Sequence, residues 1–190
     1  MTLKDYTDYY TDFFIPAYAD AIGILADKPI QLIIEQENSL SHLIKYLENS
    51  SDIDNLKKAK GHIERATLDS YKIVWIEIKK KLDKYTSIDK DNVSTAFNLA
   101  EEEVIVKLKE FDKLSLEARK VEALNIGKDN IESAKMYFEV VKIGFFLLEN
   151  IDTKKYKTYD KFDIKHFLNN HIIGFSMGIL SSVIVTLLMQ

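Results

Sequence analysis

The feature that most constrains this chain is an uncharged apolar run of eighteen residues, 172–189, directly before Gln190. A helix of roughly 20 residues at about 1.5 Å each crosses the hydrocarbon core, and shorter runs suit thinner bilayers. A buried core helix at a chain end would normally carry a polar face, whereas only Ser and Thr interrupt the apolar residues here. We therefore expect a single transmembrane helix over 171–190 that acts as a tail anchor.

Five lysines lie just before this run, and no charged side chain follows it. Lysines near a span stay on the cytoplasmic side, so we expect a membrane protein with a cytoplasmic amino terminus, in the prokaryotic inner membrane.

Aromatic residues interleave with these lysines, which is typical of an interfacial collar over anionic lipid; a solvated linker is the alternative. The expected parts are a cytosolic helical bundle over 1–150, a basic juxtamembrane segment over 151–170, and the anchor. The lysines are Lys154, Lys155, Lys157, Lys161 and Lys165, and the aromatics are Tyr156, Tyr159, Phe162 and Phe167.

The composition favours helices. Two prolines and six glycines in 190 residues leave little turn chemistry for a sheet. The absence of cysteine excludes disulfides and thiolate zinc sites. The opening residues MTLKDYTDYY are acidic where a signal peptide needs basic residues. We expect an all-α fold, an elongated bundle with long antiparallel helices.

Two helices are expected within the first fifty residues. The aromatic-rich segment 3–14 predicts a helix that ends near Pro16, because the residue before a proline disfavours helical geometry. Asp27 and Pro29 indicate an amino-terminal cap and a first-turn proline for a helix that continues to about residue 48. An apolar stripe on such a helix normally faces the core, and here it consists of Ile30, Ile33, Ile34, Leu40, Leu43, Ile44 and Leu47.

The longer helices are expected further along the chain. Apolar residues at helical spacing predict a helix over 52–85 and another over 91–126 that stops at Gly127. Both exceed the usual length, so we expect them to form a long antiparallel hairpin. A helix over 129–150 closes the bundle, and a sixth begins at about residue 163.

No catalytic or metal site can be derived from the sequence. The four histidines, His42, His62, His166 and His171, do not stand in a recognised ligand register. Phosphate-binding glycine loops and nucleophile elbows are also missing from the sequence. We expect no cofactor, no metal and no enzymatic activity.

A basic stripe is the strongest candidate for ligand binding. The segment 57–84 has nine basic and four acidic residues, in a chain with a net charge of -4. Within it Lys58, Arg65, Lys72 and Lys79 recur at every seventh residue and therefore follow one slowly drifting line along a helix. Such a line can face a polyanion, with bases stacked on nearby Tyr71 or Trp75 if the ligand is single-stranded. The alternative is a solvated face paired with acidic residues of neighbouring helices, with Trp75 in the core.

The amino terminus concentrates aromatic residues. Tyrosine and phenylalanine alternate there with aspartate, and an aromatic face of this kind usually docks against a bundle. An amphipathic membrane-surface helix would instead carry Lys and Arg on its polar face. A displaceable plug or an arm exchanged between subunits is the alternative. The aromatic residues are Tyr6, Tyr9, Tyr10, Phe13, Phe14 and Tyr18.

Small residues form a ridge on the predicted span. Gly174, Gly178, Ser182 and Thr186 recur at every fourth position. Small residues on one face allow helices to approach closely, and hydroxyl groups can bond across the contact, so we expect homo-oligomers. A ring of such helices could also line a narrow water path, and the remaining alternative is that these residues are ordinary constituents of a membrane helix.

A basic helix within a bundle, an aromatic amino-terminal arm and a small-residue tail helix together resemble the effector of the Hailong anti-phage defence system. That resemblance implies an oligomeric, channel-like membrane effector, held inactive by short single-stranded DNA that a partner enzyme makes. It also makes Lys58, Arg65, Lys72 and Lys79 the expected nucleic-acid contact. The alternative function is a tail-anchored scaffold that recruits a protein partner to the membrane.

Overall fold

The computed structural model describes residues 1–86, 96–125 and 130–155, and within these ranges every named element is a helix. This confirms the all-α prediction. One isolated antiparallel bridge joins Phe97 to Ile151. The elements are α1 (Leu3–Tyr9), the π-helix η1 (Tyr10–Phe14), α2 (Ile15–Leu25), α3 (Ile30–Glu48), α4 (Ile53–Thr86), α5 (Glu101–Leu124) and α6 (Ile131–Glu149).

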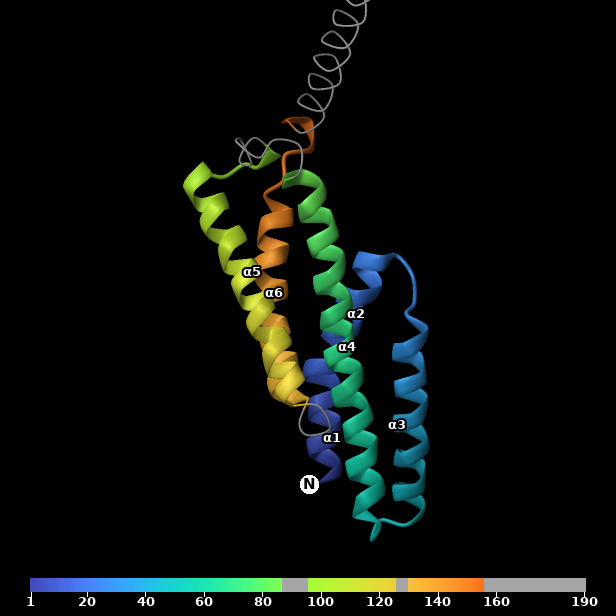
Figure 1. Ribbon diagram of the computed structural model, residues 1–190. Helices are drawn as coiled ribbons and strands as arrows, with labels where there is room; N and C mark the ends of the chain where they lie inside the picture. Colours follow the sequence, from blue (N-terminus) through green and yellow to red (C-terminus); the bar gives the residue numbers. More distant parts are fainter. Residues whose placement is uncertain (87–95, 126–129, 156–190) are drawn as a thin grey trace, which may run out of the picture.

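Helix α4 is the central element, and its 34 residues agree with the predicted helix over 52–85. Figure 1 shows α3 running antiparallel along one part of α4, with α5 and α6 on the other side. Helices α4 and α5 run antiparallel, as expected, but α6 packs against both of them. The predicted hairpin is therefore only partly right: its two helices are antiparallel, but α6 packs between them. The observed bounds of α6 agree with the expected helix over 129–150.

Two apolar cores share α4. The carboxyl-terminal half of α4 packs with α2, α5 and α6, and Val74, Ile78 and Phe111 are almost fully buried there. The amino-terminal half packs with the aromatic residues of the first helices, where Phe14, Leu56 and Ala59 have no exposed surface. The aromatic amino terminus therefore docks onto the bundle.

The first helix does not end near Pro16, so that prediction is wrong. Helices α1, η1 and α2 follow one another without a break, and Pro16 lies in the first turn of α2. The Ile15 amide bonds to the Tyr10 carbonyl, five residues back, in a widened π turn. Proline lacks an amide hydrogen and its ring clashes with the preceding turn of an α-helix. A π turn just before it accommodates this, and such turns often mark functional sites.

Two other predicted helix starts are also wrong. Asp27 does not cap α3; its carboxylate accepts the Lys28 amide at 2.7 Å, and Pro29 occupies the cap position. The predicted helix over 91–126 begins only at Glu101, because residues 96–100 instead pair with the chain beyond α6. There the Asn98 amide donates to the Asn150 carbonyl at 2.7 Å.

The apolar stripe of α3 faces outward. Leu32, Glu35 and Ser39 are the buried residues of this helix, whereas Ile30 is 73% and Leu47 60% exposed. A helix whose charged residue is inside and whose isoleucines are outside is the reverse of an ordinary amphipathic helix. Most of the predicted stripe is therefore exposed, although Leu43 packs against the core and Ile33 is half-buried. The reason lies in the polar contacts of α3 with α4.

Candidate interaction surfaces

Lys72, in the middle of the predicted basic stripe, is held by carboxylates. Its Nζ donates to Glu122 Oε1 of α5 at 2.7 Å and lies 3.8 Å from Asp69 Oδ1. Glu122 also accepts a hydrogen bond from the Tyr137 hydroxyl at 2.9 Å. Lys72 therefore joins α4 to the α5–α6 pair and is not a free cation.

Arg65 and Lys79 are paired as well. Arg65 Nη1 lies 3.7 Å from Glu35 Oε1 of α3, and Lys79 Nζ lies 3.4 Å from the carboxylates of both Asp112 and Asp83. Burial lowers the pKa of Lys79, but the carboxylates of Asp112 and Asp83 outweigh burial and raise that pKa above its ordinary value. Lys79 is therefore held in its charged form, and the two aspartates neutralise that charge.

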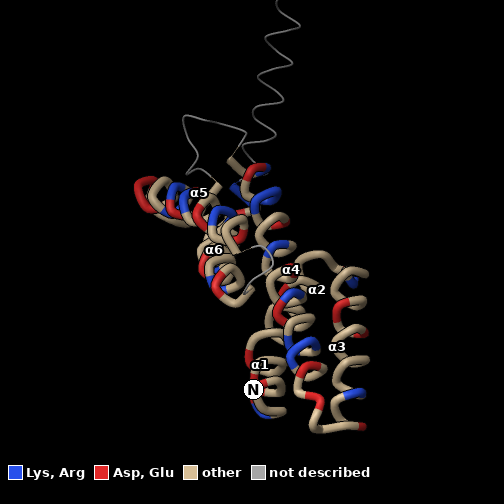
Figure 2. Tube along the Cα trace, turned by 60° about the horizontal axis from the view of Figure 1, so that its bottom comes forward, with Lys and Arg blue, Asp and Glu red and all other residues tan. Residues whose placement is uncertain are grey.

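Lys58 is the remaining member of the stripe. It is exposed, and no ion pair among the described residues involves it. Figure 2 shows Lys and Arg alternating with Asp and Glu along α4, so acidic residues interrupt the line of cations on this helix. A polyanion would have to displace carboxylates at three of the four positions.

The aromatic residues of the same segment are not available for base stacking. Trp75 Nε1 donates to Ser115 Oγ at 2.9 Å, and the indole ring packs 5.5 Å from the Tyr137 ring. Tyr71 is 6% exposed, and burial raises its pKa to about 12. Trp75 packs against the core, as the alternative interpretation of the sequence stated, and Tyr71 is part of that core.

The membrane features lie outside the described residues. These are the juxtamembrane residues from 156 onward and the span with Gly174, Gly178, Ser182 and Thr186. No helix in the described part of the chain has both the length and the apolar content needed to cross a bilayer. Lys154 and Lys155 are described, and Lys155 Nζ donates to Asn98 Oδ1 at 3.0 Å.

Polar side chains hold α3 against α4. The buried Glu35 carboxylate lies 2.7 Å from His62 Nδ1. Ser39 Oγ donates to the Ala59 carbonyl at 2.8 Å, so the Tyr6 hydroxyl, 3.0 Å away, donates to Ser39. Buried polar groups need such partners, because an unpaired one costs about 1–3 kcal/mol. These bonds fix which side of α3 faces α4.

Two histidines extend this polar contact. His42 Nδ1 lies 2.8 Å from Asn55 Oδ1, and the rings of His42 and His62 stack with their centroids 5.4 Å apart. Within the described residues, no three histidine, aspartate or glutamate side chains are placed to hold a metal ion. The arrangement is a hydrogen-bonded helix contact.

The opposite side of α3 is an apolar surface. We call it the outer face of α3, defined by Ile30, Ile34, Leu40, Ile44 and Leu47, all of which are exposed. Beside it lies an open groove of about 420 Å³ between α3 and the first helices. Several exposed apolar residues on one face of a helix typically mark a contact with another protein or a membrane. The groove is lined by Tyr6, Tyr10, Ile33, Gln36, Glu37, Leu40, Leu43 and Ile63.

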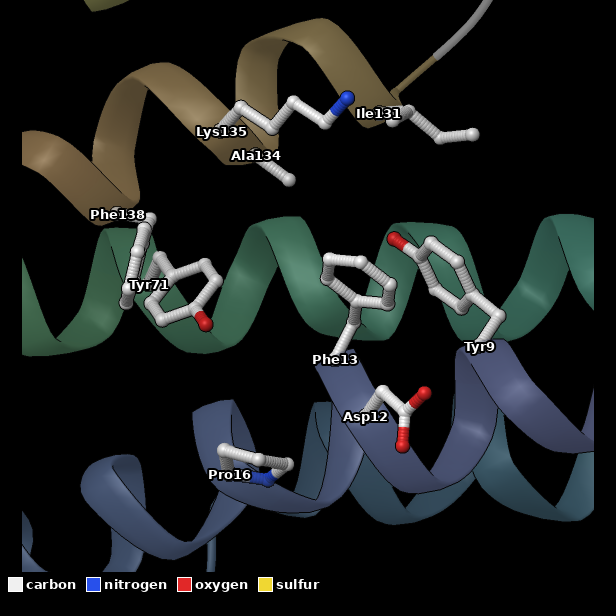
Figure 3. A pocket seen from close by; sticks show the side chains of 9 residues that line it. All are labelled: Tyr9, Asp12, Phe13, Pro16, Tyr71, Ile131, Ala134, Lys135 and Phe138. Carbon is white, nitrogen blue, oxygen red and sulfur yellow. The ribbon is translucent and has the colours of Figure 1, made fainter.

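A second hollow lies at the π turn. Figure 3 shows aromatic side chains from η1, α4 and α6 around a pocket of about 190 Å³, with Asp12 and Lys135 on opposite sides. The Tyr9 and Phe13 rings stack at 5.1 Å, and the Tyr71 and Phe138 rings lie 5.4 Å apart. Such a pocket can accept a small apolar group. The remaining lining residues are Pro16, Ile131 and Ala134.

The sequence interpretation missed the polar contact of Glu35 with His62 and the outward direction of the α3 stripe. A signal was present, since Leu32, Glu35, Ser39 and His42 share one helical face. That face is mixed, and apolar periodicity alone favours the other one. The pocket at the π turn had no sequence signal beyond the aromatic residues.

Comparisons of the chain with protein families, with curated proteins and with solved structures found no match.

Proposed function

We propose that this chain is a tail-anchored membrane effector that self-associates into a channel-like assembly in prokaryotic anti-phage defence. The observation that carries the proposal is the uncharged run 172–189 directly after a lysine-rich segment. The small-residue ridge from Gly174 to Thr186 supports close packing of several such helices. The bundle would then stand on the cytoplasmic side and control the assembly.

The described end of the chain is consistent with an anchored bundle. Beyond α6, Ile151 pairs with Phe97, and the Asp152 amide donates to the Ala96 carbonyl at 2.8 Å. These bonds hold the last described residues at the end of α4 that is opposite the α3–α4 turn (Figure 1). A change in the bundle could therefore be passed on to the segment that follows.

The proposed ligand of the bundle is an anion, of which a short single-stranded nucleic acid is the favoured example. The support is the seven-residue repeat of cations, of which Lys58 is exposed and has no described ion pair. Binding would exchange carboxylates for phosphates at Arg65, Lys72 and Lys79. Because Lys72 and Lys79 hold α5 and Arg65 holds α3, such an exchange would loosen helix contacts and would couple ligand binding to the bundle's conformation.

The second candidate function is a tail-anchored scaffold, which the exposed outer face of α3 favours. A scaffold needs only to be held at the membrane, whereas a channel-like assembly needs its own span. Exchange of residues 172–189 for an unrelated apolar helix therefore separates the two functions.

The experiment expresses the full chain, a version without residues 172–190, and the exchanged-span version in bacteria stained with a membrane-potential dye. We expect depolarisation only with the native span. A version with Gly174→Leu and Gly178→Leu should also lose depolarisation while it remains in the membrane. Equal depolarisation by the native and the exchanged span would reject the channel-like assembly and favour the scaffold.

A further inference from the structure

A heptad row runs along the outward side of α3, where it takes in Ile33 and Glu37 as well as every residue of the outer face except Ile34. Apolar residues there alternate at spacings of three and four, with a single glutamate among them, which is the pattern of helices that pack along their length. We call this row the α3 seam. It consists of Ile30, Ile33, Glu37, Leu40, Ile44 and Leu47.

The seam is turned away from the rest of the bundle. Glu35 and His42, which bond to α4, lie on the side of the helix opposite the seam. Four seam residues are about half exposed or more, and Ile33 and Glu37 line the groove beside α1. No described element covers the seam, so it remains open along most of α3.

The seam is complementary to itself when a second copy lies antiparallel. A twofold axis between residues 38 and 39 places Ile30 opposite Leu47 of the second copy, Ile33 opposite Ile44, and Glu37 opposite Leu40. A twofold interface requires this reciprocity, because each contact must occur twice. All six seam residues meet the requirement in one register.

Charge determines the direction of pairing. A parallel pair would place two Glu37 carboxylates side by side within the apolar row, and like charges there repel each other. In the antiparallel register each Glu37 lies against Leu40. The same register brings Glu48, at the end of α3, close to Lys28 of the second copy, and both are exposed. Opposite charges therefore meet at both ends of the contact.

We propose that α3 pairs antiparallel with α3 of a second copy of this chain through the α3 seam. This contact lies in the bundle and needs no membrane span, so it goes beyond the proposed function. A helix of 19 residues is about 28 Å long, so the contact is smaller than most stable interfaces. Other contacts that keep copies close together would strengthen it through effective concentration.

The absence of cysteine from the chain allows a direct test. Two full-length versions with different tags, one with Ile30→Cys and the other with Leu47→Cys, are expressed together and oxidised. In the antiparallel pair the cysteine at position 30 of one copy faces the cysteine at position 47 of the other. Two cysteines at position 30, one in each copy, would be about 25 Å apart, well beyond the roughly 7 Å that a disulfide allows between Cα atoms.

We expect a disulfide between the two differently tagged chains, and many-fold less of it between like chains. Ile44→Glu in both versions should abolish it, whereas Val106→Glu, at an even more exposed apolar position on α5, should leave it unchanged. The disulfide is scored in whichever cell fraction holds the protein, so failure of membrane attachment does not affect the result.

Three results would overturn the proposal. Disulfides between like chains would indicate a parallel pair, and equal amounts of all pairings would indicate non-specific collision. No disulfide, in proteins that circular dichroism shows to be folded, would mean that the seam does not meet a second copy and serves a different partner.

Discussion

His62 Nδ1 lies 2.7 Å from a carboxylate oxygen of Glu35, and the contact between α3 and α4 almost completely excludes Glu35 from solvent. This pair determines which face of α3 points inward. It leaves the apolar row of α3 on the outside, where a partner can reach it. The same glutamate also neutralises Arg65 of the basic stripe.

Removal of the Glu35 carboxylate should destabilise the bundle. Glu35→Ala leaves His62 and Arg65 without their partner, and we expect a loss of about 1–3 kcal/mol in the free energy of unfolding. Denaturant unfolding of the full chain in detergent, followed by the fluorescence of the single tryptophan, Trp75, measures this. Glu117→Ala is the control, because its ion pair with Lys113 is exposed and should contribute little. Equal effects of the two substitutions would contradict the role of Glu35.

Two glycines should respond to alanine in opposite directions. A Cβ atom at Gly144 would lie 2.5 Å from Ile78 Cγ2 and 3.0 Å from Phe111 Cε2. A Cβ atom at Gly61 would instead point into open space. Gly144→Ala should therefore lower the free energy of unfolding by about 1–3 kcal/mol. Gly61→Ala, in the interior of α4, should raise it by roughly 0.5–1 kcal/mol. The same sign for both would contradict the close packing of α6 on α4.

Asp69 should give a pH-dependent effect. Burial raises its pKa above the ordinary value, although Lys72 acts in the opposite direction. The folded state thus disfavours the charged carboxylate, and stability is lost as the pH rises through the raised pKa. Asp69→Asn should increase the free energy of unfolding at pH 7. The increase should vanish as the pH falls below about 4, where the wild-type carboxyl is also neutral. An increase that persists at low pH would contradict this account.

Among the residues of the basic stripe, Lys58 gives the clearest test of anion binding, because its substitution disturbs no described ion pair. Charge reversal at Lys72 or Lys79 would place like charges beside Glu122 or Asp112 and disturb the fold, whereas Lys58 has no described ion pair to lose. Lys58→Glu should weaken the binding of a labelled single-stranded oligonucleotide, and binding of the wild type should fall with salt. Lys113→Glu, on α5, is the control for net charge. Equal affinity of the wild type and Lys58→Glu would exclude Lys58 from any contact.

Sequence periodicity predicted α4 and α6 well, because both helices bury their apolar residues in the ordinary way. Ile63, Val74 and Ile78 of α4 lie in the cores as helical spacing requires. The pattern that predicts a long amphipathic helix also predicts which of its residues face the core. The all-α class therefore followed from composition and periodicity alone.

Two local features could not be derived from the same pattern. Pro16 indicates a helix end, but the π turn at Tyr10–Phe14 accommodates it and the helix continues. The stripe of α3 indicates a core face, but its direction depends on side chains of α4, chiefly His62 and the Ala59 carbonyl. Contacts with a distant segment decided the direction of the α3 stripe, and one-dimensional periodicity does not contain them.

The basic stripe shows a similar limit. Its spacing placed four cations along one line of α4, but their partners come from other helices. Glu122 and Asp112 belong to α5, and Glu35 belongs to α3. The sequence predicted the line of charge and offered pairing as an alternative, and only the fold shows which carboxylates neutralise it.

The most direct test of the account is carbonate extraction of membranes from cells that express the full chain. We predict that the full chain stays in the membrane pellet and that a version without residues 172–190 is released as a folded helical protein. Recovery of the full chain in the carbonate supernatant would contradict the proposed membrane anchor.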